Sequence, residues 1–287
     1  MAAIRPRSIV RAWQPPVPGI AEVFHARFTA HAYPAHVHDT WTLMILDGGR
    51  VDFALDGERH GAGVSDQVIL LPPGVAHDGR TVTEAGFRKR VLYLDASVLQ
   101  ERLTGAALGT PLLADPALRE RVHALHLALA EPEPFEAQSR LAFVRERLHR
   151  WLEGRAGAGP GEVPTRMPGA RVAVRLRELL DARVAEGITL EEASAELGHL
   201  HPTHLIRSFK AAYGLPPHAY LTARRVAVAR RLLLAGVGPA EAAVTAGFYD
   251  QAHLTRHFGR HVGISPARFA RSGGGSGGGS GGRTGRL

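Results

Sequence analysis

Side chains that can contact nucleic acid occupy matching positions in a sequence unit that occurs twice, within residues 189–271. His204 of the first copy matches His253 of the second, and Arg207 matches Arg256. Arginine, histidine, threonine and glutamine side chains bind base edges and phosphate oxygens. The chemistry indicated is contact with nucleic acid, and the alternative is a small helical bundle that binds none.

Each copy of the repeat is predicted to be a helix, a tight turn and a second helix. In the second copy Pro239 begins a helix, Gly247 provides the turn, and Asp250 caps the helix that follows. In the first copy Thr189 and Glu192 form a capping box. A short helix, a glycine turn and a second helix with polar outward positions indicate a helix-turn-helix.

The excess of positive charge lies in the same part of the chain. The net charge is +8, and it comes from residues 169–271 and the tail, because residues 1–168 carry equal numbers of each sign. A helix predicted over residues 217–234 separates the two copies and suits contact with phosphates. Its arginines are Arg224, Arg225, Arg230 and Arg231.

Residues 243–258 and 263–269 resemble the DNA-binding signature of the AraC/XylS family of bacterial transcription regulators. The resemblance implies two helix-turn-helix units, joined by a linker helix, whose second helices enter successive major-groove segments. By position it places five side chains in the groove, with Arg207 and Arg256 as candidates for guanine or, alternatively, for phosphate or solvent. The groove-facing residues are Thr203, Arg207, Gln251, Thr255 and Arg256. The phosphate-contact candidates are Lys210, Arg224, Arg225 and Arg260.

One residue departs from that pattern. Pro202 lies early in the first predicted recognition helix. Proline is tolerated in the first turn of a helix, so we expect it to set the helix start. It also removes one candidate base-reading side chain.

Short apolar runs recur between residues 20 and 95, and Gly, Pro and Asp turn signals such as Asp47-Gly48-Gly49 separate them. This spacing predicts a β-sandwich or barrel. Within it, His36-Val37-His38 and residues 73–77 resemble the two motifs of the cupin barrel. The resemblance implies a ligand-sensing domain ahead of the DNA-binding domain.

The histidines of these motifs are candidate ligands for a metal ion. His36, His38 and His77 would suit Zn, Fe or Mn with open positions. The cupin metal pattern normally adds a carboxylate shortly after the paired histidines. Here only Asp39 is acidic in that stretch, and it lies on the face opposite His38. We therefore expect no metal, no cofactor and no catalytic residue, and interpret the histidines as polar groups of a pocket or of the core.

Several aromatic and apolar residues either line this pocket or belong to the barrel core. Leu43 and Phe53 are in this group, and Arg88 or Arg90 would add a positive charge suited to a small anionic or hydroxylated effector. The effector-pocket candidates are His36, His38, Trp41, His77 and Tyr93.

The fold class expected is a multidomain α+β chain with a cupin-like β-barrel, accessory helices and an all-α domain with two helix-turn-helix motifs. A helical pair over residues 116–152 either forms a dimerisation surface or packs on the barrel. The expected divisions are an irregular arm (1–19), a ligand-sensing and dimerisation domain (20–153), a linker (154–169), a DNA-binding domain (170–271) and a Gly/Ser tail (272–287).

Composition excludes several classes of protein. The chain has no cysteine, so neither a disulfide framework nor thiolate chemistry is available. It has no apolar run long enough to span a bilayer and no apolar segment behind the N-terminal arginines, so we expect no membrane partner and a cytoplasmic location.

The function predicted is that of a sequence-specific transcription regulator, an activator by family resemblance, under the control of a small-molecule effector. Its partners would be double-stranded DNA, the effector and a second copy in a homodimer, and the resemblance allows RNA polymerase. The alternatives are a metal-dependent cupin enzyme with a nucleic-acid-binding domain, and a constitutive DNA-binding protein whose barrel is purely structural.

Overall fold

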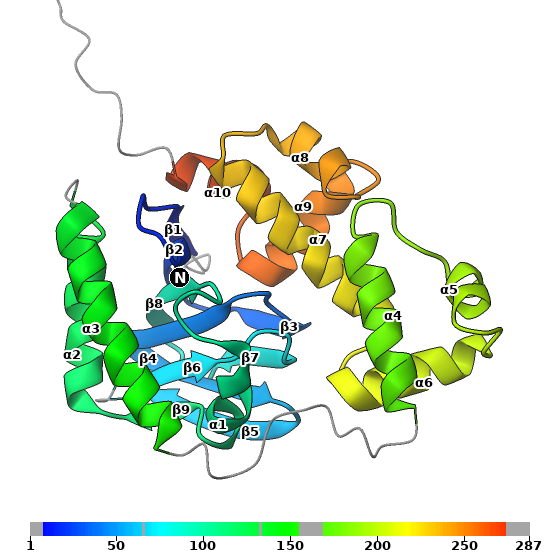
Figure 1. The fold of residues 1–287 in the computed structure, drawn as a ribbon. Helices are drawn as coiled ribbons and strands as arrows, with labels where there is room; N and C mark the ends of the chain where they lie inside the picture. Colours follow the sequence, from blue (N-terminus) through cyan, green and yellow to red (C-terminus); the bar gives the residue numbers. More distant parts are fainter. Residues whose placement is uncertain (1–7, 65–66, 132–133, 155–168, 274–287) are drawn as a thin grey trace, which may run out of the picture.

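The computed structural model describes residues 8–64, 67–131, 134–154 and 169–273. Nine strands and the helices α1–α3 form the first part of the molecule, and helices α4–α10 form the second (Figure 1). The predicted linker (154–169) and Gly/Ser tail (272–287) fall almost entirely outside the described residues. Ser272 and Gly273, which were placed in the tail, belong to the last helix instead.

Two antiparallel sheets share one long strand, β4, and give the expected cupin-like barrel. The first runs in the order β1-β2-β8-β4-β6-β9, and the second joins β3 to β7, with β7 and β5 both paired to β4. The strands are β1 (Ile9–Trp13), β2 (Ile20–Phe28), β3 (Ala32–His36), β4 (Trp41–Leu55), β5 (Glu58–Gly63), β6 (Gln67–Leu71), β7 (His77–Thr81), β8 (Phe87–Leu94) and β9 (Leu112–Ala114).

The turn expected at Asp47-Gly48-Gly49 is wrong, because β4 continues through it. The register with β8 shifts between Leu46 and Gly48, as at a β-bulge. Gly49 has φ +75°, and a Cβ there would lie 2.0 Å from the carbonyl oxygen of Gly86. The glycines therefore allow a bend and a close backbone approach inside one strand, and β4 reaches both sheets.

The irregular arm expected over residues 1–19 is also wrong for residues 9–13, which form β1 at the edge of the first sheet. β1 pairs along its length with β2. Its other edge lies against α10 (Pro266–Gly273), where the backbone N–H of Ala12 donates to Oγ of Ser272 at 3.2 Å. A helix against the free edge of a strand hinders pairing of that strand with another chain.

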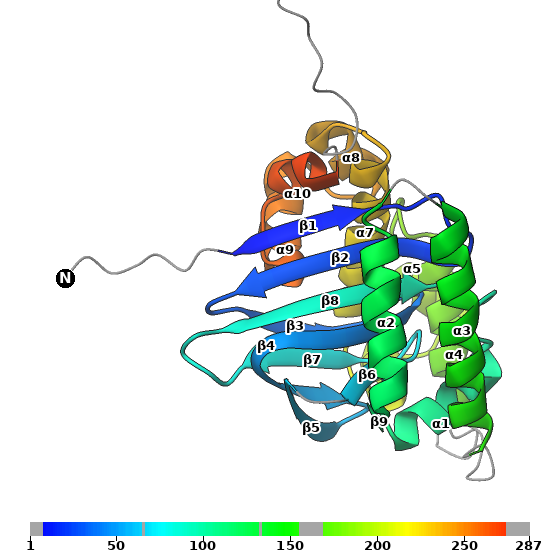
Figure 2. The same cartoon turned by 90° about the vertical axis from the view of Figure 1, so that its left-hand side faces the viewer.

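Helices α2 (Pro116–Ala128) and α3 (Pro134–Glu153) form the predicted pair and cover one face of the first sheet (Figure 2). η1 (Glu101–Leu103) and α1 (Thr104–Gly109) precede them. Asp115 caps α2 by accepting from the backbone N–H of Leu118 at 3.0 Å, and its other oxygen accepts from Arg147 of α3 at 2.7 Å. The apolar sides of both helices pack against the buried residues Trp41 and Leu43 of β4.

The seven remaining helices confirm the duplicated helix-turn-helix. The capping box at Thr189 and the cap at Asp250 are both present, and Pro202 stands at the first position of its helix. The helices are α4 (Ala170–Ala182), α5 (Leu190–Glu196), α6 (Pro202–Tyr213), α7 (Pro217–Leu234), α8 (Pro239–Thr245), α9 (Gln251–Val262) and α10. No described helix is long and apolar enough to cross a membrane.

The helical part packs directly onto the barrel. One hydrophobic cluster contains Phe24 and Phe28 of β2 together with Val226 of α7, Phe258 of α9 and Phe269 of α10. The chain was expected to divide into a ligand-sensing domain and a DNA-binding domain, whereas the structure has an apolar core that continues from the barrel into α7–α10. The two parts therefore share a buried apolar boundary.

Candidate functional site

A small cavity opens inside the barrel, on the side that the helical part covers. Its walls include four of the five pocket candidates, namely His36, His38, His77 and Tyr93. The room inside is about 60 Å³ for the centres of water-sized molecules. This is enough for a few waters or one small ligand.

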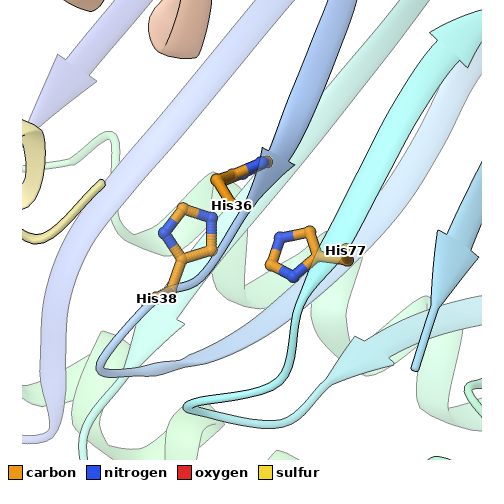
Figure 3. A group of neighbouring side chains, drawn as sticks. All are labelled: His36, His38 and His77. Atoms are coloured by element: carbon orange, nitrogen blue, oxygen red, sulfur yellow. The ribbon is translucent and has the colours of Figure 1, made fainter. Parts of the chain in front are cut away.

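The three imidazoles of the motif histidines face one another (Figure 3). The ring centres of His36 and His77 are 4.4 Å apart, those of His36 and His38 are 4.9 Å apart, and those of His38 and His77 are 5.0 Å apart. One nitrogen from each ring lies within 4.8 Å of the others. β3 and the start of β7, which pair at His36 and His77, bring these residues together.

These imidazoles are neutral near pH 7. Burial lowers the pKa of His77 to about 4. Burial also lowers the pKa values of His36 and His38, and the neighbouring imidazoles add to the effect. A neutral imidazole has one nitrogen lone pair, which can accept a hydrogen bond or bind a metal.

Lys89 and Arg230 place cationic groups on the cavity wall, and neither was among the pocket candidates. Lys89 of β8 lies 4.4 Å from the centre of the Tyr33 ring, and burial together with Arg230 lowers its pKa to about 7. Arg230 comes from α7, where its guanidinium donates to Glu22 at 2.5 Å and contacts the hydroxyl of Tyr93 at 3.4 Å. Cationic groups from both the barrel and α7 therefore border the cavity.

The structure places the other proposed pocket residues elsewhere, apart from Phe53, which lines the cavity. Trp41 and Leu43 point to the opposite face of the sheet, where Nε1 of Trp41 donates to the carbonyl of Leu99 at 2.7 Å. Arg90 points away from the cavity and forms an ion pair with Asp47 at 2.7 Å, and Arg88 is exposed. Neighbouring residues of the same strands, Thr42, Met44 and Lys89, take these places in the wall.

The proposed groove-facing side chains all lie on exposed positions of the two second helices. Thr203 and Arg207 are exposed on α6, and Gln251, Thr255 and Arg256 are exposed on α9. Lys210 and Arg260, two phosphate-contact candidates, are exposed on the same helices. No described residue of the barrel covers these seven side chains.

The arginines of α7 are engaged within the chain. Arg224 forms ion pairs with Asp39 at 3.1 Å and with Asp181 at 3.0 Å. Arg225 donates to the carbonyl of Val184 at 2.8 Å. Arg230, for which phosphate contact was expected, is only 8% exposed and points into the barrel, so that expectation is wrong. Arg231 forms an ion pair with Asp39 at 2.9 Å.

α9 contributes directly to the cavity wall. His261 and Val262, at its C-terminal end, line the cavity, and the His261 ring centre is 5.8 Å from that of His36. The next residue, Gly263, has φ +87°, and a Cβ there would lie 2.4 Å from Phe28 of β2. Sequence periodicity places His261 on the helix but carries no signal that it faces the barrel.

Two family models match this chain. Residues 19–143 match a model described as an AraC-like ligand-binding domain, and residues 194–272 match a helix-turn-helix domain. The two matches include the cavity residues of the barrel and the exposed residues of α6 and α9.

Several known proteins are similar to it. An uncharacterized HTH-type transcriptional regulator of Bacillus subtilis, YbfI, is 26% identical over 81% of this chain and 85% of its own length. The virulence regulon transcriptional activator VirF of Yersinia enterocolitica is 30% identical over 35% of this chain and 37% of its own. A structure of ToxT from Vibrio cholerae with a bound unsaturated fatty acid covers 94% of this chain and 96% of its own, with TM-score 0.57 and 12% identity.

Proposed function

The chain belongs to the AraC family of transcription regulators, and from this premise we propose that a small anion in the barrel cavity controls how its two helix-turn-helix units engage promoter DNA. The observation that carries the proposal is the composition of the cavity wall. Arg230 of α7 and His261 of α9 stand beside the barrel residues. A ligand in this cavity touches both the sensing and the DNA-binding parts.

The charge of the cavity favours an anionic effector. Lys89 faces it from β8, and its lowered pKa reflects the energetic cost of a buried ammonium group. A carboxylate or phosphate beside Lys89 would remove that cost. It would also compete with Glu22 for Arg230 and so weaken the contact that holds α7 to the barrel. A ligand shifts this equilibrium only by its difference in affinity for the two arrangements.

Three contacts support barrel control over the helices that would read DNA. Asp39, just after β3, pairs with Arg224 and Arg231 of α7. Glu22 of β2 pairs with Arg230. In the proposed regulation, release of α7 frees Arg224 for phosphate and lets α6 and α9 adopt the spacing of successive groove segments. Arg225, Lys210 and Arg260 remain further phosphate candidates.

A thermal-shift screen with small carboxylates and phosphates tests the effector. We expect at least one anion to stabilise the wild-type chain, by about 2.7 kcal/mol at a hundred times its dissociation constant. Lys89→Gln should abolish the shift, and Arg88→Gln, an exposed change on the same strand, should keep it. A chain that no anion stabilises, or an unchanged shift in Lys89→Gln, would favour a purely structural barrel.

We also propose that the chain forms a homodimer. The outward side of α2 and α3 exposes Leu127 and Phe143, which supports a homodimer through this pair. Sedimentation of Phe143→Glu tests it, because loss of the dimer is expected.

By analogy with the activator VirF we propose that this chain activates transcription, with RNA polymerase as partner. We also propose that it acts in the cytoplasm and without catalysis.

A further inference from the structure

We propose that His36, His38 and His77 bind one divalent transition-metal ion. This inference departs from the expectation of no metal, and it goes beyond the proposed function because it requires neither DNA nor an anionic effector. It is carried by the position of the three rings, by their hydrogen bonds and by the open space in front of them.

The spacing of the rings fits a single ion. Three imidazoles that bind Zn²⁺ in tetrahedral geometry, with Zn–N of about 2.0–2.1 Å, have ring centres roughly 5 Å apart. The observed separations are 4.4, 4.9 and 5.0 Å. The nearest ligand nitrogens lie within 4.8 Å of one another. Small rotations of the rings are therefore enough to close the site.

The outer hydrogen bonds already fix two of the ligands. Nδ1 of His36 donates to the carbonyl of Pro34 at 2.8 Å, and Nδ1 of His77 donates to the carbonyl of Val75 at 3.0 Å. In both residues Nδ1 thus carries the proton, and Nε2 is left with the lone pair. A histidine that binds a metal commonly donates its other nitrogen to a carbonyl in this way, which fixes its tautomer and its orientation.

The ligand set also indicates which ions are suitable. Three neutral imidazoles with no carboxylate favour Zn²⁺, Ni²⁺, Co²⁺ or Fe²⁺ over the oxygen-preferring Mg²⁺ and Ca²⁺. Asp78 lies next to His77, but its carboxylate accepts from the backbone of Ala54 at 2.7 Å and faces Arg59 at 3.6 Å. The fourth coordination position therefore opens to the cavity, where water or an anion completes the sphere.

The site lies against the DNA-binding part of the molecule. The ring of His38 is 5.1 Å from that of Tyr93, whose hydroxyl contacts Arg230 of α7. The ring of His36 is 5.8 Å from that of His261 on α9. An ion at this place draws His36 and His38 inward, so it changes the surfaces on which α7 and α9 rest. Occupancy of the site and docking of α9 are therefore coupled.

Metal titration of the full-length chain tests the proposal. After removal of metals with a chelator, we expect Zn²⁺ or Co²⁺ alone to bind at one ion per chain with high affinity, with a Co²⁺ absorption spectrum typical of four-coordinate nitrogen ligation. His38→Gln and His77→Gln should weaken binding by more than the roughly 10- to 100-fold that follows loss of an outer hydrogen-bond partner. His218→Ala, an exposed histidine on α7, should bind as the wild type does.

Circular dichroism identifies variants that remain folded, and His38→Gln is the safer of the two because His38 is only half-buried. Hydrogen exchange of α9, with and without Zn²⁺, tests the coupling, and the change in exchange should vanish in His38→Gln. Absence of a one-per-chain ion in the wild type, or equal affinity in the folded variants, would overturn the metal site. Unchanged exchange of α9 on saturation with Zn²⁺ would overturn the coupling.

Discussion

Two exposed basic residues, Arg256 on α9 and Lys210 on α6, differ in what they can recognise. A guanidinium group can bind two acceptors of one guanine, whereas an ammonium group acts on phosphate as a point charge. We expect Arg256→Ala to weaken the free energy of binding to the operator by about 1–3 kcal/mol, and to unrelated DNA by much less. Lys210→Ala should weaken binding to both DNAs alike, and it should lower the slope of log affinity against log salt concentration by about 1.

Electrophoretic mobility shifts at several salt concentrations, on operator and on scrambled DNA, separate these two effects. An equal loss on both DNAs for Arg256→Ala would make this arginine a phosphate contact.

Asp115 serves both as the cap of α2 and as the partner of Arg147. Asp115→Ala should destabilise the chain by about 1 kcal/mol through loss of the cap, and further through loss of the ion pair. Asp115→Asn keeps a capping oxygen, so it should cost less than Asp115→Ala. Chemical denaturation of the three proteins measures the differences.

The same residue predicts a dependence on pH. The hydrogen bond from Arg147 lowers the pKa of Asp115 below its usual value near 4. Because the folded-state pKa is the lower one, the ion pair stabilises the chain above pH about 4, and its contribution is lost as the pH falls further. The difference between wild type and Asp115→Asn should therefore shrink below pH 4. A constant difference down to pH 2 would contradict this.

The side of the barrel that meets the cavity could be predicted where a polar side chain marks it. His36, His38, His77 and Tyr93 are placed on the cavity by the structure, as expected. Trp41 is not, because β4 is apolar on both faces and its sequence does not show which face meets the cavity. Tyr93 could have identified two further residues of the cavity wall. Lys89 lies four residues before it on the same face of β8, and Thr42 pairs with it across the sheet.

At the scale of the elements, the two helix-turn-helix units share a glycine turn but differ in its surroundings. Gly198 and Gly247 both have positive φ, at +92° and +85°. A Cβ at Gly198 would meet nothing within 4 Å, whereas one at Gly247 would lie 2.2 Å from the carbonyl oxygen of Ala185. Alanine at Gly198 should therefore cost about 1 kcal/mol of backbone strain. Alanine at Gly247 should cost several times more.

Thermal unfolding of Gly198→Ala and Gly247→Ala compares the two turns directly. Equal melting temperatures would show that the turn after α4, which contains Ala185, moves without an energetic cost, contrary to the tight contact described above. The better-packed turn is also the one next to Arg225, which donates to the carbonyls of Val184 and Ala185.

The helices were predictable because each end carries its own signal. Thr189, Asp250 and the two glycines act within one turn of the chain, so no distant contact is needed to find them. The strands were less predictable from the sequence. The bend of β4 at Asp47 depends on Arg90 and Gly86 of other elements, and β1 forms because β2 and α10 cover its two edges.

At the scale of the whole molecule, the buried pair of Glu22 and Arg230 holds the helical part on the barrel. Loss of one partner leaves an unpaired buried charge and should lower the free energy of unfolding by about 3–5 kcal/mol. We expect Arg230→Met to raise hydrogen exchange along α7 and the neighbouring part of β2. The double variant Glu22→Met/Arg230→Met should recover most of the protection, because both charges are gone.

If Arg230→Met leaves exchange unchanged, the apolar contacts of α9 and α10 hold the two parts without this pair. This contact could not be predicted from the sequence. Arg230 belongs to a basic helix that also contains Arg224, Arg225 and Arg231, and only the packed structure shows that one of the four is buried.

A nuclease footprint on the DNA upstream of the coding region tests whether this chain binds two groove segments under the control of an anion. We expect protection of two major-groove segments about one helical turn apart, weakened steeply by salt and shifted by the effector anion. Arg207→Ala or Arg256→Ala should abolish the protection. Uniform protection at low salt that disappears at higher salt, with no preferred segment and no effect of either variant, would contradict sequence-specific binding by the two helix-turn-helix units.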